Sequence, residues 1–375
     1  MKVGCPKEIK PQEFRVGLTP AAVNELVRRG HSVTVETNAG QGAGFVDSDY
    51  EKEGADIVGS AKEVFDKADM IVKVKEPQAI ERNMLKSGQL LFTYLHLAPD
   101  PEQTHDLIDS GCTAIAYETV TDLNGGLPLL APMSEVAGRL APQMGAWTLQ
   151  KANGGRGVLL GGVPGVAPAK VLVLGGGVVG TNAARVAAGM GADVTVLDKS
   201  LSRLRYIDDV FGHLFKNGYA SQKATAELAS QADLIIGAVL VAGAEAPKLI
   251  SKEQLSTLQP GTALVDVAID QGGCFETSRA TTHADPIYEI DGIMHYCVAN
   301  MPGAVARTST LALGNATLPF IISLADKGWV KACSDNPHLF NGLNVHDGKL
   351  TYSAVGEALG IETVKPDLKA LSILH

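Results

Sequence analysis

Short apolar runs alternate with longer amphipathic runs through residues 1–130 of the chain. The apolar runs have the length of buried strands, and the longer runs repeat their apolar positions with helical spacing. We predict strands at Lys2–Cys5, Ser32–Glu36, Met70–Val74, Leu90–Leu95 and Thr113–Ala116, and helices at Pro20–Arg29, Ala61–Lys67, Ala79–Lys86 and Pro101–Ser110. This alternation is typical of a parallel sheet with helices on both faces.

The same alternation restarts in the second half of the chain. A helix-like stretch, Met133–Ala152, and a loop rich in glycine and proline, Gly154–Pro168, separate the two halves. Further strands are then expected at Lys170–Leu174, Val194–Leu197, Leu234–Val239, Ala263–Val267 and His295–Val298. The pattern therefore predicts the α/β class, with two doubly wound parallel-sheet domains.

The pattern becomes helical again after the second run of strands. A long helix is expected at Thr308–Lys327, and the tail from Gly328 is irregular and then weakly helical. A helix that returns at this point is expected to pack on the first half. We therefore predict a discontinuous domain of residues 1–130 and 305–375, with a second domain of residues 131–304 inserted in it.

Composition and charge narrow the class of protein. The chain has 375 residues, enough for two domains, and its 45% hydrophobic and 19% charged residues are typical of a globular enzyme. The net charge of -9 provides no basic excess to neutralise phosphates. A general nucleic-acid binder is therefore not expected.

The cysteines and the apolar segments bear on the compartment. The five cysteines are scattered and form no CxxC pair, so neither a disulfide framework nor a zinc site is expected. The first ten residues are charged and lack the apolar core of a signal peptide. Prolines and Lys170 interrupt the most apolar stretch, Gly157–Gly180. We expect a cytoplasmic protein with reduced thiols and no membrane span.

The segment Ala169–Asp198 has the features of a dinucleotide-binding unit. A strand leads into Gly175-x-Gly177-x-x-Gly180, a helix of small residues follows, and a second strand ends at Asp198. The first glycine permits the tight turn, the second lets the backbone approach the pyrophosphate, and the third lets helix and strand pack closely. Free N–H groups at the helix start would then face the phosphates.

The acid at the end of the second strand indicates which dinucleotide binds. A carboxylate at Asp198 can accept hydrogen bonds from the ribose hydroxyls and would repel a 2′-phosphate, so NAD is preferred over NADP. Lys199 and Arg203 lie nearby and weaken that preference. A glycine-rich turn alone is weak evidence, and sites for FAD or S-adenosylmethionine remain as alternatives.

Four polar residues follow predicted strands at the edge where ligands bind in open parallel sheets. Arg15 lies in the loop after the first strand, Lys75 and His96 each follow a later strand of the first half, and Asp270 follows a strand of the second half. Arg15 could bind a substrate carboxylate, and Lys75 could bind the same carboxylate or polarise a carbonyl oxygen. His96 can exchange a proton near neutral pH, and Asp270 can orient or deprotonate an amine. We expect these groups to meet at a cleft between the domains.

Each of these residues also has an ordinary structural interpretation. Lys75, within VKVKEP, is typical of a solvated surface charge, and His96, within TYLHLAP, of a structural histidine. Asp270 precedes two glycines and would suit a turn. Ser134 is expected to cap the linking helix, a role that is compatible with a coenzyme contact.

Six motifs together give the chain a resemblance to a known family. They are EFRVGLTP (Glu13–Pro20), VKVKEP (Val72–Pro77), YLHLAP (Tyr94–Pro99), LGGGVVG (Leu174–Gly180), VDVAIDQGG (Val265–Gly273) and YCVANMPGAVARTST (Tyr296–Thr310). In these stretches the chain resembles the alanine dehydrogenase and transhydrogenase alpha-subunit family, from its first strand to its tail. None of the motifs is specific alone, but their combination is.

The resemblance implies a function and a set of site residues. It implies reversible NAD-dependent oxidative deamination of L-alanine to pyruvate and ammonia, with residues 131–304 as the Rossmann-type NAD domain and the remainder as the substrate domain. It implies that Arg15 and Lys75 bind substrate, that His96 and Asp270 are the catalytic acid/base residues, and that the chain forms a homohexamer. The implied coenzyme contacts, together with the glycines of the fingerprint, are Ser134, Gly175, Gly177, Val178, Val179, Gly180, Asp198, Arg203, Val239, Leu240, Val267, Ala268, Ile269, Asp270, Arg279, Val298, Ala299, Asn300 and Met301.

Two departures and three rival functions qualify the resemblance. Ala220 stands where some relatives carry a serine that helps to hold the cofactor. Lys327 stands where some relatives carry a histidine, which binds magnesium together with an acid at the position of Glu118. We therefore expect no metal. The rivals are a soluble NAD-binding subunit of a proton-translocating transhydrogenase, a saccharopine dehydrogenase, and a non-catalytic NAD sensor.

Overall fold

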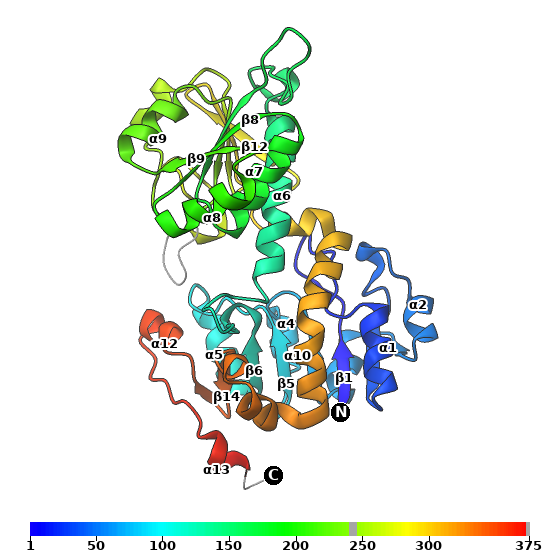
Figure 1. The fold of residues 1–375 in the computed structure, drawn as a ribbon. Coiled ribbons are helices and arrows are strands. Elements are labelled where there is room, and N and C mark those ends of the chain that lie inside the picture. The colour runs from blue at the N-terminus through cyan, green and yellow to red at the C-terminus, as the bar shows by residue number, and fades with distance from the viewer. Residues whose placement is uncertain (240–245, 373–375) are drawn as a thin grey trace. The chain divides into compact units, whose positions relative to one another are not determined.

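The computed structural model describes residues 1–239 and 246–372 and divides into two compact units (Figure 1). Unit 1 comprises Met1–Met133 with Val305–His375, and unit 2 comprises Ser134–Ala304. Both units have the α/β fold that the alternating pattern predicts.

Unit 1 is built on an eight-stranded sheet of order β15-β14-β6-β5-β4-β1-β2-β3. Its strands are β1 (Lys2–Cys5), β2 (Ser32–Glu36), β3 (Asp56–Val58), β4 (Met70–Val72), β5 (Leu90–Thr93), β6 (Thr113–Ala116), β14 (Leu343–His346) and β15 (Lys349–Leu350). Its helices are α1 (Pro20–Arg28), α2 (Asp47–Lys52), α3 (Ala61–Lys67), α4 (Ala79–Arg82), α5 (Pro101–Ser110), α10 (Ala306–Asp335), α11 (Pro337–Phe340), α12 (Ser353–Leu359) and α13 (Leu368–Ser372). The central strands β4, β5 and β6 are buried along their whole length, which explains their continuous apolar runs.

Unit 2 is built on a seven-stranded sheet of order β12-β13-β11-β10-β7-β8-β9. Its strands are β7 (Lys170–Leu174), β8 (Asp193–Asp198), β9 (Lys216–Tyr219), β10 (Leu234–Gly237), β11 (Ala263–Asp266), β12 (Ile287–Ile290) and β13 (Ile293–Tyr296), and its longer helices are α6 (Ala131–Thr148), α7 (Val178–Gly189), α8 (Leu201–Phe211) and α9 (Gln222–Ala229). α6 begins at Ala131, so Ser134 lies inside its first turns and is not the N-cap that we expected.

Both sheets are parallel through their central strands, as expected, and carry antiparallel strands at one edge. β14 pairs antiparallel with β6, β15 pairs antiparallel with β14, and β12 pairs antiparallel with β13. Tight turns join β12 to β13 and β14 to β15, and such turns can join only antiparallel strands. The tail after the kink at Gly328 is therefore partly a strand hairpin rather than irregular chain.

The long helix α10 belongs to the core of unit 1. The helical stretch Met301–Asp335 has the length and composition of a membrane span. Leu313, Ile321 and Leu324 of α10 are nevertheless buried within the unit, and Gly328 interrupts the helical backbone at φ 72°. One face of this apolar helix therefore packs in the interior of the unit.

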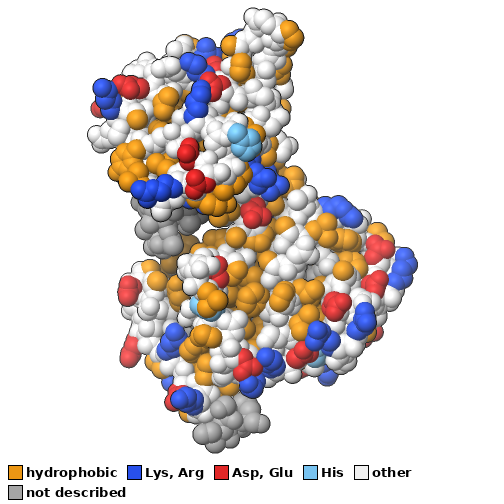
Figure 2. Space-filling view, in the orientation of Figure 1, with side chains coloured by type: hydrophobic (Ala, Val, Ile, Leu, Met, Phe, Trp, Pro, Cys, Tyr) orange, Lys and Arg blue, Asp and Glu red, His pale blue; other side chains and the backbone are white. Residues whose placement is uncertain are grey.

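Charges and thiols follow the pattern of an ordinary globular surface and interior. On the face shown in Figure 2, acidic and basic side chains are interspersed over both units. All five cysteines are free and buried. Burial raises the pKa of the thiols to about 11 for Cys112 and Cys297 and to about 12 for Cys5, Cys274 and Cys333.

A buried histidine on β13 makes the stability of unit 2 dependent on pH. The His295 ring is fully buried; its Nδ1 donates to the carbonyl of Ile293 at 3.0 Å, and its Nε2 accepts from Thr277 Oγ1 at 2.8 Å. Burial lowers its pKa below the ordinary 6.5. As the pH falls below the ordinary value, the unfolded chain takes up a proton that the folded chain does not, so folding stability is lost toward acid.

We expect His295→Gln to weaken this acid sensitivity. A single group of this kind contributes up to about 1.4 kcal/mol of destabilisation per pH unit within its window. The drop in thermal midpoint between about pH 7.5 and about pH 5.5, the range around an ordinary histidine pKa, should be larger in the wild type than in the variant. His105→Gln, at an exposed histidine of α5, is the control and should keep the wild-type drop.

Candidate functional site

The glycines after β7 form a cradle at the start of α7. Gly175 has φ 101°, and a Cβ there would lie 2.8 Å from the carbonyl oxygen of Ala238. A Cβ on Gly180 would lie only 1.7 Å from the carbonyl oxygen of Gly175, so the close approach of helix and strand requires glycine. Gly177, the N-cap of α7, has open space around its Cβ position. The backbone is thus exposed where a pyrophosphate would approach.

Asp198 lies at the end of β8, beside this cradle. Its Oδ2 accepts a hydrogen bond from the N–H of Gly176 at 2.6 Å, and its Oδ1 accepts one from Ser200 at 2.7 Å. Each carboxylate oxygen has a further lone pair that can accept from a ribose hydroxyl. Arg203 donates from Nε to the Gly176 carbonyl and from Nη2 to Thr181 Oγ1, so it braces the same turn.

A cavity of about 790 Å³ opens next to the cradle within unit 2. It is lined by Leu174, Gly175, Leu197, Asp198, Lys199, Ala220, Gln222, Lys223, Thr225, Ala226, Val239, Pro247, Lys248, Leu249, Ser251 and Gln254. The lining combines apolar walls with a carboxylate at the strand end, as an adenosine site would need. The cradle, the carboxylate and the cavity together fit a dinucleotide such as NAD.

Several other residues implied as coenzyme contacts lie at the same edge of the sheet of unit 2. Those that follow the carboxyl ends of β10, β11 and β13 are Val239, Val267 to Asp270, and Val298 to Met301. Ser134 lies on α6, which packs so closely on α7 that a Cβ on Gly138 would meet the carbonyl oxygen of Val179 at 2.3 Å. Leu240 lies outside the described residues.

Asp270 is exposed on the single 3-10 turn after β11. Its Oδ1 accepts a hydrogen bond from the N–H of Asn300 at 3.4 Å, and Asn300 itself has a left-handed backbone at φ 57°. Arg279, farther along the same loop, lies with its guanidinium 4.0 Å from the centre of the Tyr288 ring. The loops after β11 and β13 therefore meet at Asp270.

Arg15 and Glu13 form a buried pair in the loop after β1. Nε and Nη2 of Arg15 donate to the two oxygens of Glu13 at 2.7 and 2.6 Å, and Nη1 donates to the sulfur of Met133 at 3.0 Å. Burial alone would lower the pKa of Arg15, but the hydrogen bonds and charge of Glu13 outweigh it and raise the pKa. The guanidinium is thus fixed in place and charged.

A buried ion cluster lies under the backbone that carries Lys75. Lys73 is fully buried, and its Nζ donates to Glu8 at 3.1 Å and to Glu81 at 2.7 Å. Glu8 also accepts from the backbone N–H groups of Val74 at 2.6 Å and Lys75 at 3.3 Å. Lys73 lies in the core just after β4, whereas Lys75, two residues later, is only half-buried. The cluster fixes the position of the Lys75 backbone.

His96 follows β5 and has a strained backbone with an exposed ring. Its φ is 52°, in the left-handed region, and its side chain is 46% exposed. Glu118, just after β6, accepts from the N–H groups of Leu95 at 3.1 Å and His96 at 2.6 Å, and lies 4.0 Å from the imidazole Nδ1. The ring stacks on Tyr94 with centroids 5.9 Å apart. Such strain is characteristic of functional positions.

The structure thus brings together three of the predicted residues at one edge of one sheet. Arg15, Lys75 and His96 follow β1, β4 and β5, which are neighbours in the order of strands. Two cations suit a carboxylate, and an exposed imidazole suits proton transfer beside it. Sequence reasoning missed Glu8, Glu13 and Lys73, because a lone acid or lysine in a sequence shows neither its burial nor its partner.

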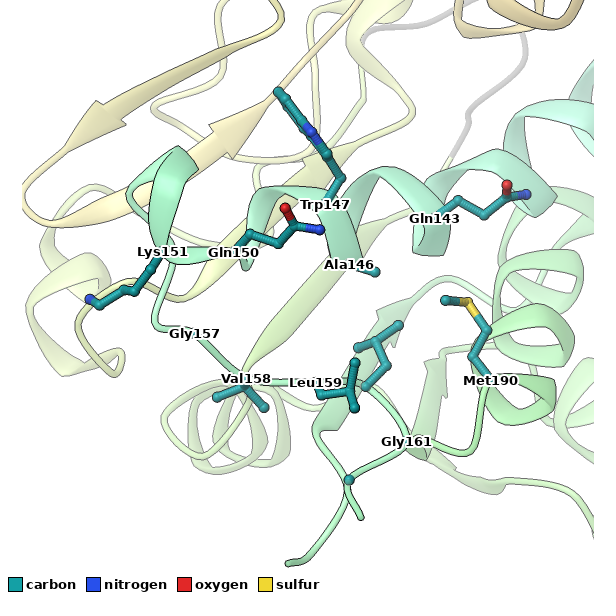
Figure 3. Close-up of a pocket in the computed structure, with 12 residues that line it drawn as sticks. Gln143, Ala146, Trp147, Gln150, Lys151, Gly157, Val158, Leu159, Gly161 and Met190 are labelled. Carbon is teal, nitrogen blue, oxygen red and sulfur yellow. The ribbon is translucent and has the colours of Figure 1, made fainter.

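A second cavity of about 810 Å³ lies in unit 2, near the amino end of β7. Figure 3 shows Gln143 and Trp147 of α6 on one side of the cavity. Val158 and Leu159, in the loop between α6 and β7, lie on the other side with Met190. None of the residues that we predicted for the site lines it. It is therefore separate from the dinucleotide cradle, which lies at the carboxyl ends of the strands.

Metal ligands are not clustered in the part of the chain that the structure describes: no group of three or more His, Cys, Asp or Glu side chains is placed to hold an ion. Glu118 accepts the backbone hydrogen bonds described above, and Lys327 pairs with Asp335 at 2.8 Å.

Comparison with known proteins gives matches over nearly the whole chain. Residues 4–137 match the family model for the N-terminal domain of alanine dehydrogenase/PNT, and residues 141–353 match the model for its C-terminal domain. The chain is 62% identical to an alanine dehydrogenase of Halomonas elongata over 97% of this chain and 98% of that protein, and 54% identical to one of Bacillus subtilis over 99% and 98%.

Solved structures agree with these matches. An L-alanine dehydrogenase superposes with a TM-score of 0.93 and 51% identity, covering 96% of this chain and 99% of that one. A transhydrogenase of Sinorhizobium meliloti superposes with a TM-score of 0.82 at 24% identity, covering 94% and 100%. At that identity the second comparison concerns the fold alone.

Proposed function

This chain belongs to the alanine dehydrogenase/PNT family, and on that premise we propose that it catalyses the reversible NAD-dependent oxidative deamination of L-alanine to pyruvate and ammonia. One observation carries the proposal: a carboxylate-binding pair of cations and an exposed imidazole share an edge of one sheet, in a chain that also holds a dinucleotide cradle. A transhydrogenase subunit or an NAD sensor would need the cradle but not the substrate groups.

Unit 1 acts as the substrate domain, with Arg15 and Lys75 binding the carboxylate of alanine or pyruvate. Glu13 holds the Arg15 guanidinium in a fixed orientation and offsets part of its charge. Lys75, which is only half-buried, adds a second positive charge for the substrate carboxylate.

Proton transfer falls to His96 and Asp270. The exposed imidazole of His96 can take a proton from water that adds to the oxidised α-carbon, and return it in the reverse direction. Asp270 orients the amine and shares in its deprotonation. NAD supplies the hydride acceptance when it is bound.

Unit 2 acts as the NAD domain, with the coenzyme contacts named in the sequence analysis. The turn shaped by Gly175 and Gly180 would hold the pyrophosphate against the backbone at Gly177, and Asp198 would bind the ribose hydroxyls. The same carboxylate favours NAD over NADP, because it would repel a 2′-phosphate.

An amino-acid panel tests the function directly. Purified protein with NAD⁺ should form NADH with L-alanine, and pyruvate with ammonia should consume NADH. Transfer of hydride between NADH and an NADP analogue only when a membrane partner is present would favour a transhydrogenase subunit. Binding of NADH without turnover on any amino acid would contradict the proposal and favour a sensor.

We further propose that the chain is cytoplasmic and forms a homohexamer. Leu159, which lines the second cavity, and Val163 and Val166 in the same loop are 55–65% exposed, which supports association through this loop. Buried free thiols suit a reducing compartment. Light scattering should give six times the chain mass of 39.2 kDa, and a monomeric mass would contradict the hexamer.

A further inference from the structure

Asp266 ends β11 and is a buried carboxylate with four hydrogen-bond donors. It is 0% exposed, and among the described residues no lysine or arginine forms an ion pair with it. Burial raises its pKa, against the lowering effect of its hydrogen bonds. An acid in such a position costs stability compared with an apolar residue. Its presence therefore calls for a reason other than stability.

The four donors come from both ends of one loop. Oδ1 accepts from the N–H of Ala268 at 3.1 Å. Oδ2 accepts from the N–H groups of Cys274 at 2.7 Å and Phe275 at 3.3 Å, and from Ser278 Oγ at 2.5 Å. The carboxylate thus ties residues 267–278 into a closed loop.

Two glycines of this loop allow the backbone to lie close to the same carboxylate. Gly273 has φ 79°, and a Cβ there would lie 2.7 Å from Asp266 Oδ2. Lys248 donates from Nζ to the carbonyls of Gly272 at 2.6 Å and Gly273 at 2.9 Å, and holds the turn from outside. The closure of the loop therefore explains why glycine stands at both positions, without a contact to a ligand.

Asp270 lies at the outer end of this loop. Its side chain is exposed, whereas its neighbours Ala268 and Ile269 are buried. The only backbone elements between Asp266 and Asp270 are the turn at Ala268 and the short 3-10 turn Ile269–Gln271. A shift at the Ala268 hydrogen bond would therefore move Asp270 directly.

We propose that Asp266 is a positioning residue, which fixes the loop that presents Asp270 and does not itself touch substrate or coenzyme. The assignment rests on the proposed function, since it gives Asp270 a role in proton transfer. Displacement of a catalytic group by about 1 Å can lower a rate by up to about a hundredfold. Partial release of the loop should therefore have a clear kinetic effect.

Asp266→Asn is the test variant, and Asp233→Asn is its matched control. An asparagine has the same shape but only one acceptor oxygen. It must therefore lose either the hydrogen bond from Ala268 to Oδ1 or the hydrogen bonds that Oδ2 accepts. Asp233 also accepts from a backbone N–H, that of Lys170 at 2.8 Å, and pairs with Arg156 at 3.1 Å. It precedes β10, at the opposite edge of the same sheet.

Two measurements report on the loop. Hydrogen exchange of the peptide covering residues 267–279, measured without coenzyme, should be at least about tenfold faster in Asp266→Asn and unchanged in Asp233→Asn. The kcat for alanine should fall about tenfold in Asp266→Asn with little change in KM, and should stay at the wild-type value per folded Asp233→Asn enzyme.

A double-mutant cycle separates positioning from general destabilisation. If Asp266 acts through Asp270, Asp266→Asn should cause no further fall in kcat once Asp270→Asn is present. Fully additive effects, or unchanged exchange of residues 267–279, would overturn the proposal. A wild-type protein without alanine turnover would instead count against the proposed function, and the exchange measurement would still decide whether Asp266 holds the loop.

Discussion

Replacement of His96 by asparagine is expected to lower kcat for alanine by about 10²- to 10⁴-fold, the range for loss of a general acid–base group. Asparagine is the suitable substitute because it tolerates the left-handed backbone at φ 52° that His96 adopts. The hydrogen bond from the backbone N–H of residue 96 to Glu118 can therefore persist. The side chain retains polarity but cannot exchange a proton.

Coenzyme affinity separates this effect from misfolding. Titration of NADH by its fluorescence should give the wild-type dissociation constant in His96→Asn, since His96 belongs to unit 1 and the cradle to unit 2. His105→Asn, at an exposed histidine in the same unit, should leave kcat unchanged. Wild-type turnover in His96→Asn would remove the imidazole from the mechanism.

The second large effect is expected at the coenzyme cradle, where Gly180→Ala should weaken NADH binding about 10- to 100-fold. The added methyl would lie 1.7 Å from the carbonyl oxygen of Gly175, a backbone atom that cannot rotate away. Relief requires α7 and the turn to separate, at a cost of about 1–3 kcal/mol, which corresponds to that loss of affinity.

Gly189→Ala, at the other end of α7, is the matched control. A Cβ on Gly189 would meet nothing within 4 Å, and alanine is a better helix former than glycine. NADH affinity should be unchanged and the thermal midpoint equal or higher. Equal NADH affinities for Gly180→Ala and the wild type would show that the cradle does not hold the coenzyme.

Local sequence patterns predicted the central strands and missed those at the edges. Lys2–Cys5, Thr113–Ala116 and Lys170–Leu174 form strands with the predicted bounds, because each is an apolar run buried on both faces. β9 (Lys216–Tyr219) has the sequence KNGY and no buried residue, so its own sequence does not indicate that it forms a strand beside β8. Strands of this kind form because a neighbouring strand supplies hydrogen-bond partners.

The same distinction applies to the site. Arg15, Lys75 and His96 could be selected from sequence because each follows a predicted strand, and the glycine fingerprint has a fixed spacing. The acids that hold these groups could not be selected. Glu8 is 65 residues from Lys73 in the chain, and nothing in the local pattern indicates that the two meet in the core. Their pairing is a result of the order of strands in the sheet.

The burial of every cysteine makes the chain well suited to site-specific labelling. A thiol must ionise to react quickly, and all five native thiols have a raised pKa. Cysteines introduced at exposed lysines, Lys62 of α3 in unit 1 and Lys216 of β9 in unit 2, would carry fluorescent probes against an unreactive background. Energy transfer between the probes would then follow any motion of the units as coenzyme and alanine bind.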